Sequence, residues 1–276
     1  MNTKKVSNTP SIEVFVATHK KFDMPTNDPI YKPILGGSKL NPQPQFGYLS
    51  DAIGENISEK KVWYNELTSL FWAWKNSTAD IKGLCHYRRF FFDSYFSVNK
   101  EHVLTGKQII EDLESHDIIL PAPYRYSEST VKEAFSMSGK ADNSALFVAE
   151  KIIKDMYPDY AEAFDNVMKR NEISLCNSFI ARRKIFDTYA QWLFSILFQC
   201  EPLLDLENRE GQRQRIMGFL GERLLDVWVE KNQLRIRYRM LNNIEQKKNI
   251  KYYVKVILEK FGIRLVGKHI KDCNKL

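Results

Sequence analysis

The sequence predicts an α/β fold with a mostly parallel central sheet, helices on both faces of the sheet, and a basic helical tail. Short apolar runs rich in β-branched residues alternate with longer segments of helical periodicity, which is typical of such sheets. A length of 276 residues with 43% hydrophobic residues allows a sizeable core. The charge is uneven: residues 231–276 carry 13 basic and 3 acidic residues, although the whole chain carries only +7. We therefore divide the chain into a mildly acidic domain, residues 1–230, and a basic tail, residues 231–276.

The first half of the domain contains two predicted strands with a long loop and a helix between them. Residues 12–18, IEVFVAT, are a β-branched apolar run and predict the first strand. Residues 22–54 are rich in Pro, Gly, Asn and Asp and predict a long loop without strands. Ser58 is a suitable N-cap for an amphipathic helix. The next strand is predicted at residues 81–87, IKGLCHY.

The second half continues the alternation. Residues 103–115 predict a helix and residues 116–124 a strand that ends at two prolines. Helical periodicity covers most of residues 145–170, and a short strand is predicted within residues 174–182. The apolar run in residues 186–198 is too short to span a bilayer and predicts a buried helix.

Several common classes of site have no support in the sequence. The four cysteines contain no CxxC pair, which argues against a zinc site or a disulfide framework. The sequence contains no GxGxxG, GxxxxGK[ST], HExxH or GxSxG motif. The polar N-terminal residues contain no apolar signal region, so we expect a cytoplasmic protein.

Two groups of polar residues follow predicted strands and are candidates for ligand binding, because ligands of such sheets bind at the carboxyl ends of the strands. These residues are Thr18, His19 and Lys20 after the first strand, and His86, Tyr87, Arg88 and Arg89 after residues 81–85. Paired guanidinium groups at a strand end are suited to a diphosphate. An alternative is that one arginine pairs with Asp93 while the other covers aromatic neighbours, and His19 could be a solvated loop histidine.

A second candidate site lies in residues 212–231, QRQRIMGFLGERLLDVWVEK. Gly218 and Gly221 are predicted to bracket a turn, which places Glu222 in the first turn of a helix. A carboxylate at that position could act as a general base. The commoner role is an acidic residue that interacts favourably with the helix dipole.

These segments resemble a known family. FVATHKKFDMP, ENISEKKVWYNELTSLFWAWKN, GLCHYRRFF, CNSFIARRKIFDTYAQWLFSILF and GFLGERLLDVW occur in this order. They are similar to the bacterial capsule, O-antigen and exopolysaccharide glycosyltransferases long described as a domain of unknown function, some of which are assigned as galactofuranosyltransferases. The resemblance covers roughly residues 12–230, is weaker between about Val131 and Ala145, and implies a GT-A-like nucleotide-sugar fold.

The resemblance also implies roles for the candidate residues. HYRR stands where most GT-A enzymes carry the Asp-x-Asp motif that binds a divalent metal. Arg88 and Arg89 would stabilise the leaving UDP, which favours a mechanism without metal or other cofactor, although Asp93 leaves a divalent cation open. Glu222 would deprotonate the acceptor. The remaining donor-binding residues would be Thr18, His19, Lys20, Asn56, Tyr64, His86 and Tyr87.

The function expected from this resemblance is transfer of a hexose, with galactofuranose a candidate, from a UDP-sugar to a lipid-linked polysaccharide intermediate by a single inverting displacement. A first alternative is a nucleic-acid-binding protein whose basic tail follows phosphates, but the acidic domain argues against nucleic acid as a partner. A second alternative is a non-catalytic scaffold of a polysaccharide assembly.

The basic tail has the pattern of an amphipathic helix. Its apolar residues fall on one helical face, at Ile250, Tyr253, Val254, Ile257, Leu258 and Phe261. Such a helix can either pack on the domain or lie on the anionic inner face of the cell membrane, where each Lys or Arg adds about 1 kcal/mol. Membrane attachment would bring the enzyme to a lipid-linked acceptor.

We predict that the full chain co-sediments with anionic liposomes at low salt and that a chain ending at Asn243 does not, because the truncation removes most of the basic residues of the tail. Neutral liposomes are the control. If both chains remain in the supernatant with anionic lipid, the tail is a structural element of the domain.

Overall fold

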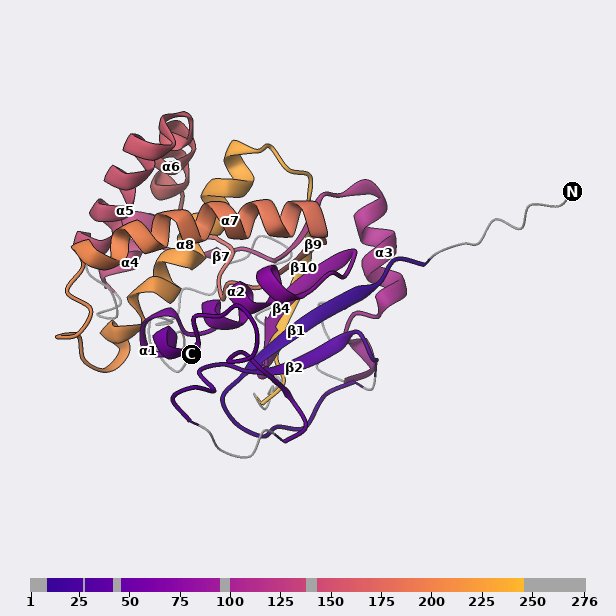
Figure 1. The fold of residues 1–276 in the computed structure, drawn as a ribbon. Helices are drawn as coiled ribbons and strands as arrows, with labels where there is room; N and C mark the ends of the chain where they lie inside the picture. The colour runs from indigo at the N-terminus through magenta and orange to yellow at the C-terminus, as the bar shows by residue number, and fades with distance from the viewer. Residues whose placement is uncertain (1–8, 27, 42–45, 95–99, 138–142, 246–276) are drawn as a thin grey trace, which may run out of the picture.

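An eight-stranded sheet forms the centre of the computed structural model, which describes residues 9–26, 28–41, 46–94, 100–137 and 143–245 (Figure 1). The strand order is β3-β2-β1-β4-β5-β10-β6-β9, and β4 also pairs with β9. The strands are β1 Ile12–Thr18, β2 Tyr31–Leu35, β3 Leu49–Ser50, β4 Ile81–His86, β5 Arg89–Phe92, β6 Ile118–Pro121, β9 Phe179–Arg182 and β10 Ile236–Asn243. A separate ribbon pairs β7 Tyr124–Arg125 with β8 Glu172–Ile173.

Helices cover both faces of the sheet unequally (Figure 1). The helices are α1 Lys61–Tyr64, α2 Leu67–Asn76, α3 Gly106–Ser115, α4 Val131–Met137, α5 Asn143–Met156, α6 Ala161–Lys169, α7 Arg183–Cys200 and α8 Ile216–Lys231. Short 3₁₀ turns are η1 Ser58–Lys60, η2 Lys100–His102, η3 Pro158–Tyr160, η4 Glu201–Leu203 and η5 Gly211–Arg215. The larger core contains residues of α1, α2 and α4–α8, whereas α3 contributes to the core on the opposite face.

The alternation of side chains along the strands produces these two cores. In β1, Phe15 and Ala17 face the larger core while Val14 and Val16 face the α3 side. The central strands therefore read as continuous apolar runs, because both faces are buried. This burial explains why the predicted strand at residues 12–18 matches β1, and why the apolar run of residues 186–198 lies in the buried helix α7.

The sheet is mixed rather than mostly parallel, which corrects the prediction from sequence. Strands β1, β2, β3 and β4 run parallel, as do β6 and β10. In contrast, β5 pairs antiparallel with β4 and β10, and β9 pairs antiparallel with β4 and β6. The reason is that the chain after β4 turns back directly into β5 instead of crossing over through a helix.

The predicted tail also begins too early. Residues 236–243, assigned from sequence to a basic helical tail, form strand β10 between β5 and β6. Two of their arginines, Arg237 and Arg239, donate to the buried carboxylate of Asp112 over 3.1 and 2.8 Å. Part of the basic charge therefore belongs to the sheet, and the amphipathic segment from residue 246 onward lies outside the described residues.

The proline- and glycine-rich residues 22–54 contain strands β2 and β3, contrary to the expected loop without strands. The buried carboxylate of Asp51 stabilises the turn that follows β2. It accepts hydrogen bonds from the backbone N–H groups of Gly37 and Ser38, at 2.7 and 3.0 Å, and from the hydroxyl of Ser58 at 2.6 Å. The carboxylate of Asp51 thus supplies the acceptor for backbone N–H groups of this turn, a contact that the pattern of prolines and glycines does not predict.

We predict that Asp51→Ala lowers the free energy of unfolding by about 2–5 kcal/mol, because two backbone N–H groups lose their acceptor in a buried place. Urea unfolding monitored by circular dichroism measures this. The matched control is Glu59→Ala, which removes an exposed ion pair with Lys39 beside the same turn and should cost less than about 1 kcal/mol. Equal losses in the two variants would contradict the assigned role of Asp51.

Candidate functional site

The carboxyl ends of β1, β2 and β4 meet at one edge of the sheet. Ala17 lies beside His86 in the parallel register, and the N–H of Tyr87 donates to the carbonyl of Ala17 over 3.1 Å. On the other side of β1, the N–H of Gly36 donates to the carbonyl of Thr18 over 2.9 Å. This register brings together the predicted donor-binding residues Thr18, His19, Lys20, His86, Tyr87, Arg88 and Arg89.

Tyr87 organises this edge. It lies in the two-residue turn between β4 and β5, where His86 pairs with Arg89, and its side chain is buried. The ring of His19 contacts the ring of Tyr87 edge-on at 5.3 Å, and the charged groups of Arg88 and Lys20 lie 4.8 and 5.1 Å from its centre. Arg88 also donates a hydrogen bond to the Tyr87 hydroxyl. These contacts hold two cations at the strand ends.

Four cations at this edge, Lys20, Lys61, Arg88 and Arg89, form a set that we call the basic cluster. Lys20 and Arg88 share the carboxylate of Glu245, at 3.8 and 3.2 Å. Within the part of the chain that the structure describes, the side chains of Lys61 and Arg89 make no hydrogen bond or ion pair, although both are half-buried. The basic cluster therefore has positive charge in excess of its partners, which favours an anionic ligand.

The turn after β2 makes room for Lys61. A Cβ atom on Gly36 would lie 2.6 Å from the Nζ of Lys61, and one on Gly37 would lie 2.5 Å from its Cγ. Gly37 also has a φ of 76°, which favours glycine. The glycine pair thus allows the ammonium group to approach the carboxyl end of β2.

Burial, together with the surrounding positive charge, keeps both histidines neutral near pH 7. Burial, followed by the charges of Arg89 and Lys61, lowers the pKa of His86 to about 2. Partial desolvation and the charges of Lys61 and Arg88 lower the pKa of His19, although much of this side chain is exposed. The positive charge of this edge is therefore carried by lysine and arginine, and the imidazoles can serve only as neutral hydrogen-bonding groups.

Two predicted donor-binding residues do not join this edge. Asn56 uses its side-chain amide within its own loop, where its Nδ2 donates to the carbonyls of Ala52 and Gly54 over 3.2 and 2.7 Å. Tyr64 has no exposed surface, and its hydroxyl donates to Glu201 over 2.9 Å. Both residues stabilise the fold beside the site.

Asp93, the residue that could take part in a divalent cation site according to the sequence, lies at the opposite end of β5. It accepts from Gln108 Nε2 at 3.1 Å and lies 2.9 Å from the Nδ1 of His102. No group of three or more His, Cys, Asp or Glu side chains is arranged to hold a metal ion among the described residues. Metal independence stays a prediction.

Glu222 lies in the second turn of α8 rather than in the first turn of a helix that begins after Gly221. The helix starts at Ile216, directly after η5, and continues through both glycines. A Cβ atom on Gly221 would lie 2.8 Å from the Oδ1 of Asn177. Gly221 therefore allows close packing of the helix against the segment before β9, and does not mark a turn.

The carboxylate of Glu222 is nearly enclosed, with 15% of its side chain exposed. It accepts from the backbone N–H of Cys176 over 3.0 Å and from Arg223 over 2.7 Å. Burial is the main cause that raises its pKa; Arg223 lowers the pKa and the neighbouring charge of Glu66 raises it. Glu222 and Glu66 form a set that we call the carboxylate pair, and a raised pKa makes Glu222 the better proton acceptor.

Strained backbone surrounds the carboxylate pair. Three residues other than glycine have positive φ angles here: Asn65 at 51°, Cys176 at 78° and Asn177 at 48°. The Nδ2 of Asn177 donates to Glu66 over 2.7 Å and to the carbonyl of Gly218 over 3.0 Å. Clustered strain of this kind is typical of functional sites. Sequence reasoning missed Asn65, Glu66 and Asn177, although asparagine is the usual residue at such angles.

Arg215, which sequence reasoning also missed, connects the basic cluster and the carboxylate pair. Its Nε donates to the Oδ1 of Asn65 over 2.9 Å, and its Nη2 lies 3.9 Å from Glu66. Its charge lowers the pKa values of both His19 and Glu222, so it lies near the basic cluster and near the carboxylate pair. The site thus places a region for an anion beside a buried carboxylate that can accept a proton.

The chain is similar to one protein family and to a solved glycosyltransferase structure. The family model described as "Domain of unknown function (DUF4422)" matches residues 13–233. A solved structure titled "WbbM bifunctional glycosytransferase apo structure" is similar with a TM-score of 0.79 and 26% identity over 86% of this chain. This chain spans about half, 46%, of that protein. A comparison with curated proteins found no match.

Asp226, one turn after Glu222, has the clearest pH-dependent role in stability. Its Oδ2 accepts from the N–H of Ser174 over 3.1 Å, while its buried Oδ1 has no partner among the described residues. Burial raises the pKa of Asp226 to about 7. Between about pH 4 and pH 7 the folded chain therefore binds a proton that the unfolded chain releases, and the free energy of unfolding falls as the pH rises through this window.

We predict that Asp226→Asn makes this fall smaller, by on the order of a few kcal/mol between about pH 5 and about pH 8. Urea unfolding at the two pH values measures it. Glu162→Gln, which changes an exposed carboxylate of α6, is the control and should keep the slope of the natural chain. An unchanged slope in Asp226→Asn would show that Asp226 is ionised throughout.

Proposed function

The chain belongs to the family described as Domain of unknown function (DUF4422), and from this premise we propose that it is a glycosyltransferase that uses a nucleotide sugar. The observation that carries the proposal is the position of a basic cluster, whose positive charge exceeds that of its acidic partners, beside a buried carboxylate pair. The similarity to a bifunctional glycosyltransferase supports the same reaction class. A glycosyl transfer from a nucleotide sugar requires both parts, because a diphosphate leaves as an anion while the acceptor hydroxyl loses a proton.

The basic cluster would bind the donor diphosphate. Arg89 and Lys61 have no partners within the described residues, so they are available for phosphate oxygens without loss of an existing ion pair. Arg88 is held by Tyr87 and Glu245 and would add a third cation in a fixed place. Preorganised positive charge stabilises the leaving group as the bond to the sugar breaks.

Glu222 would act as the general base. The acceptor oxygen forms a bond to the anomeric carbon while the bond from that carbon to the diphosphate breaks, and the hydroxyl proton moves to the Glu222 carboxylate. A single displacement of this kind inverts the anomeric configuration. The N–H of Cys176 and the guanidinium of Arg223 fix the orientation of the carboxylate. Glu66 supports the reaction because its negative charge raises the pKa of Glu222.

The finer assignment follows from the family resemblance. We propose a UDP-sugar as the donor, a hexose with galactofuranose as one candidate, and a lipid-linked saccharide as the acceptor in capsule, O-antigen or exopolysaccharide synthesis. We also propose that the reaction needs no metal and that residues 246–276 attach the enzyme to the inner membrane face. No helix of the described residues meets the length and hydropathy of a membrane span.

We predict that a change in the basic cluster impairs UDP binding, whereas a change in the carboxylate pair impairs turnover. UDP at 100 times its dissociation constant should stabilise the natural chain by about 2.7 kcal/mol, measured as thermal unfolding. Arg89→Ala should lose most of this stabilisation. Glu222→Gln should keep it while turnover of the UDP-sugar falls by about two orders of magnitude or more.

Arg183→Ala is the matched control, because Arg183 is exposed and pairs with Asp80 beside the start of β4, away from the strand ends that form the site. It should retain binding and turnover. No stabilisation by UDP in the natural chain would favour a non-catalytic scaffold. Activity lost with EDTA and restored by manganese would contradict the metal-free part of the proposal alone.

A further inference from the structure

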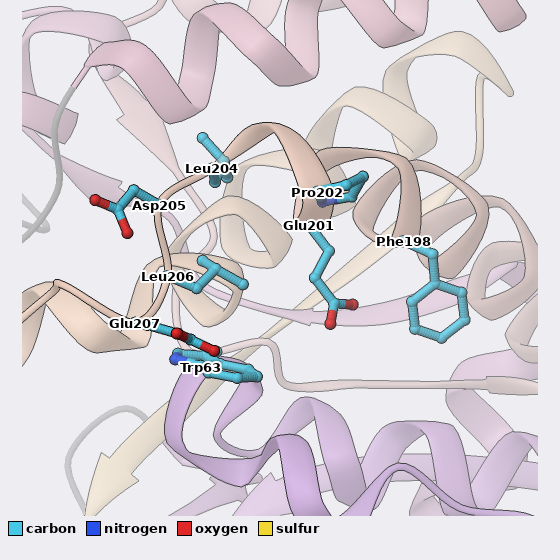
Figure 2. A pocket seen from close by; sticks show the side chains of 8 residues that line it. All are labelled: Trp63, Phe198, Glu201, Pro202, Leu204, Asp205, Leu206 and Glu207. Atoms are coloured by element: carbon cyan, nitrogen blue, oxygen red, sulfur yellow. The ribbon is translucent and has the colours of Figure 1, made fainter.

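A cavity of about 450 Å³ lies beside α1 (Figure 2), and its lining includes no residue of the basic cluster or the carboxylate pair. Its volume is in the range of about 300–1,000 Å³ that is usual for small-molecule sites. It is lined by Trp63, Phe198, Glu201, Pro202, Leu204, Asp205, Leu206 and Glu207. Most of these residues come from the end of α7, η4 and the segment that follows, and Trp63 comes from α1.

The lining combines aromatic rings with carboxylates. Figure 2 shows the side chain of Glu201 pointing between those of Trp63 and Phe198. Glu201 is held in place, because it accepts from the Tyr64 hydroxyl over 2.9 Å and pairs with Lys60. The exposed carboxylate of Glu207 makes no hydrogen bond or ion pair within the described part of the chain. The cavity thus has a rigid polar centre and a free acceptor at its rim.

This chemistry suits a neutral saccharide. Sugar rings have apolar C–H faces that pack on an indole or phenyl ring, and their hydroxyl groups donate to carboxylates. Of the described residues that line the cavity, Glu201, Asp205 and Glu207 are acidic and none is a lysine or an arginine, so a phosphate or another anion would be repelled. A cationic ligand is less suited, because the ammonium of Lys60 already pairs with Glu201 and lies 5.8 Å from the centre of the Phe198 ring.

The cavity and the carboxylate pair share a short segment of chain, because Trp63 lines the cavity and Glu66 belongs to the pair. Trp63 precedes Glu66 by three residues, so their Cα atoms are at most ~11 Å apart. We propose that the cavity is a subsite for the acceptor, which binds sugar residues adjacent to the one that carries the reacting hydroxyl. This inference rests on the proposed function, and it concerns the acceptor rather than the anionic donor.

The test is saccharide binding by the full chain without any donor. The probes are neutral galacto- and manno-oligosaccharides, from di- to tetrasaccharides, without lipid or phosphate. Saturation-transfer NMR identifies a binder, and titration gives its dissociation constant. We expect Trp63→Ala to weaken binding by about tenfold or more, as for a central aromatic contact, and Glu207→Gln to weaken it severalfold.

Phe147→Ala is the control, because Phe147 is an exposed aromatic residue on α5, with 68% exposure, and does not line the cavity. It should bind the saccharide normally. Stabilisation by UDP in each variant checks that the fold is intact, and Glu207→Gln, at an exposed position, provides the test if Trp63→Ala fails to fold.

Three results would overturn the subsite. One is saccharide binding that neither Trp63→Ala nor Glu207→Gln weakens. Another is binding of spermine that Glu207→Gln abolishes, with no saccharide bound, which would make the cavity a cation site. The third is absence of saccharide binding while UDP still stabilises the chain, in which case the proposed glycosyltransferase stands without this subsite. If UDP also fails to bind, the proposed function itself is wrong.

Discussion

The parallel alignment of β1, β2 and β4 is the constraint on which the site depends. Because these strands end at one edge of the sheet, the residues that directly follow them lie close together. The turn after β4 then reverses into β5, so Tyr87 is buried beneath His19, Lys20 and Arg88. Lys20 and Arg88 lie over the face of this ring and share a single carboxylate, that of Glu245. Two cations that share one carboxylate leave positive charge available for a ligand.

The two halves of the site influence each other electrostatically. Arg215 lowers the pKa values of His19 and Glu222, so its charge reaches both the strand ends and α8. A bound anion would oppose the positive charge acting on the carboxylate pair and would raise the pKa of Glu222 further. Binding of the donor would therefore strengthen the base that the second substrate needs.

Much of the sheet edge could be predicted from sequence, because buried strands and the polar residues that follow them have a strong local pattern. Glu222 was recognised as a candidate, but its place within α8 was not, since Gly218 and Gly221 resemble a turn unless the approach of Asn177 is known. The partners Lys61, Glu66 and Asn177 depend on contacts between distant segments, which periodicity does not contain. The same dependence on distant contacts explains β10. Its arginines were assigned to a basic tail because their partner, Asp112, is far away in the sequence.

Charge also separates the regions that we propose for the two substrates. The basic cluster is suited to an anionic donor and repels cations, whereas the cavity lined by Glu201, Asp205 and Glu207 repels phosphate and accepts neutral hydroxyl groups. Helix α1 lies between these regions and contributes to both, with Lys61 at the turn after β2 and Trp63 at the cavity. Its end at Asn65, where φ is 51°, brings Glu66 back toward Glu222. Lys61 and Trp63 of this four-residue helix, with Glu66 directly after its strained end, thus contribute to the proposed donor and acceptor regions.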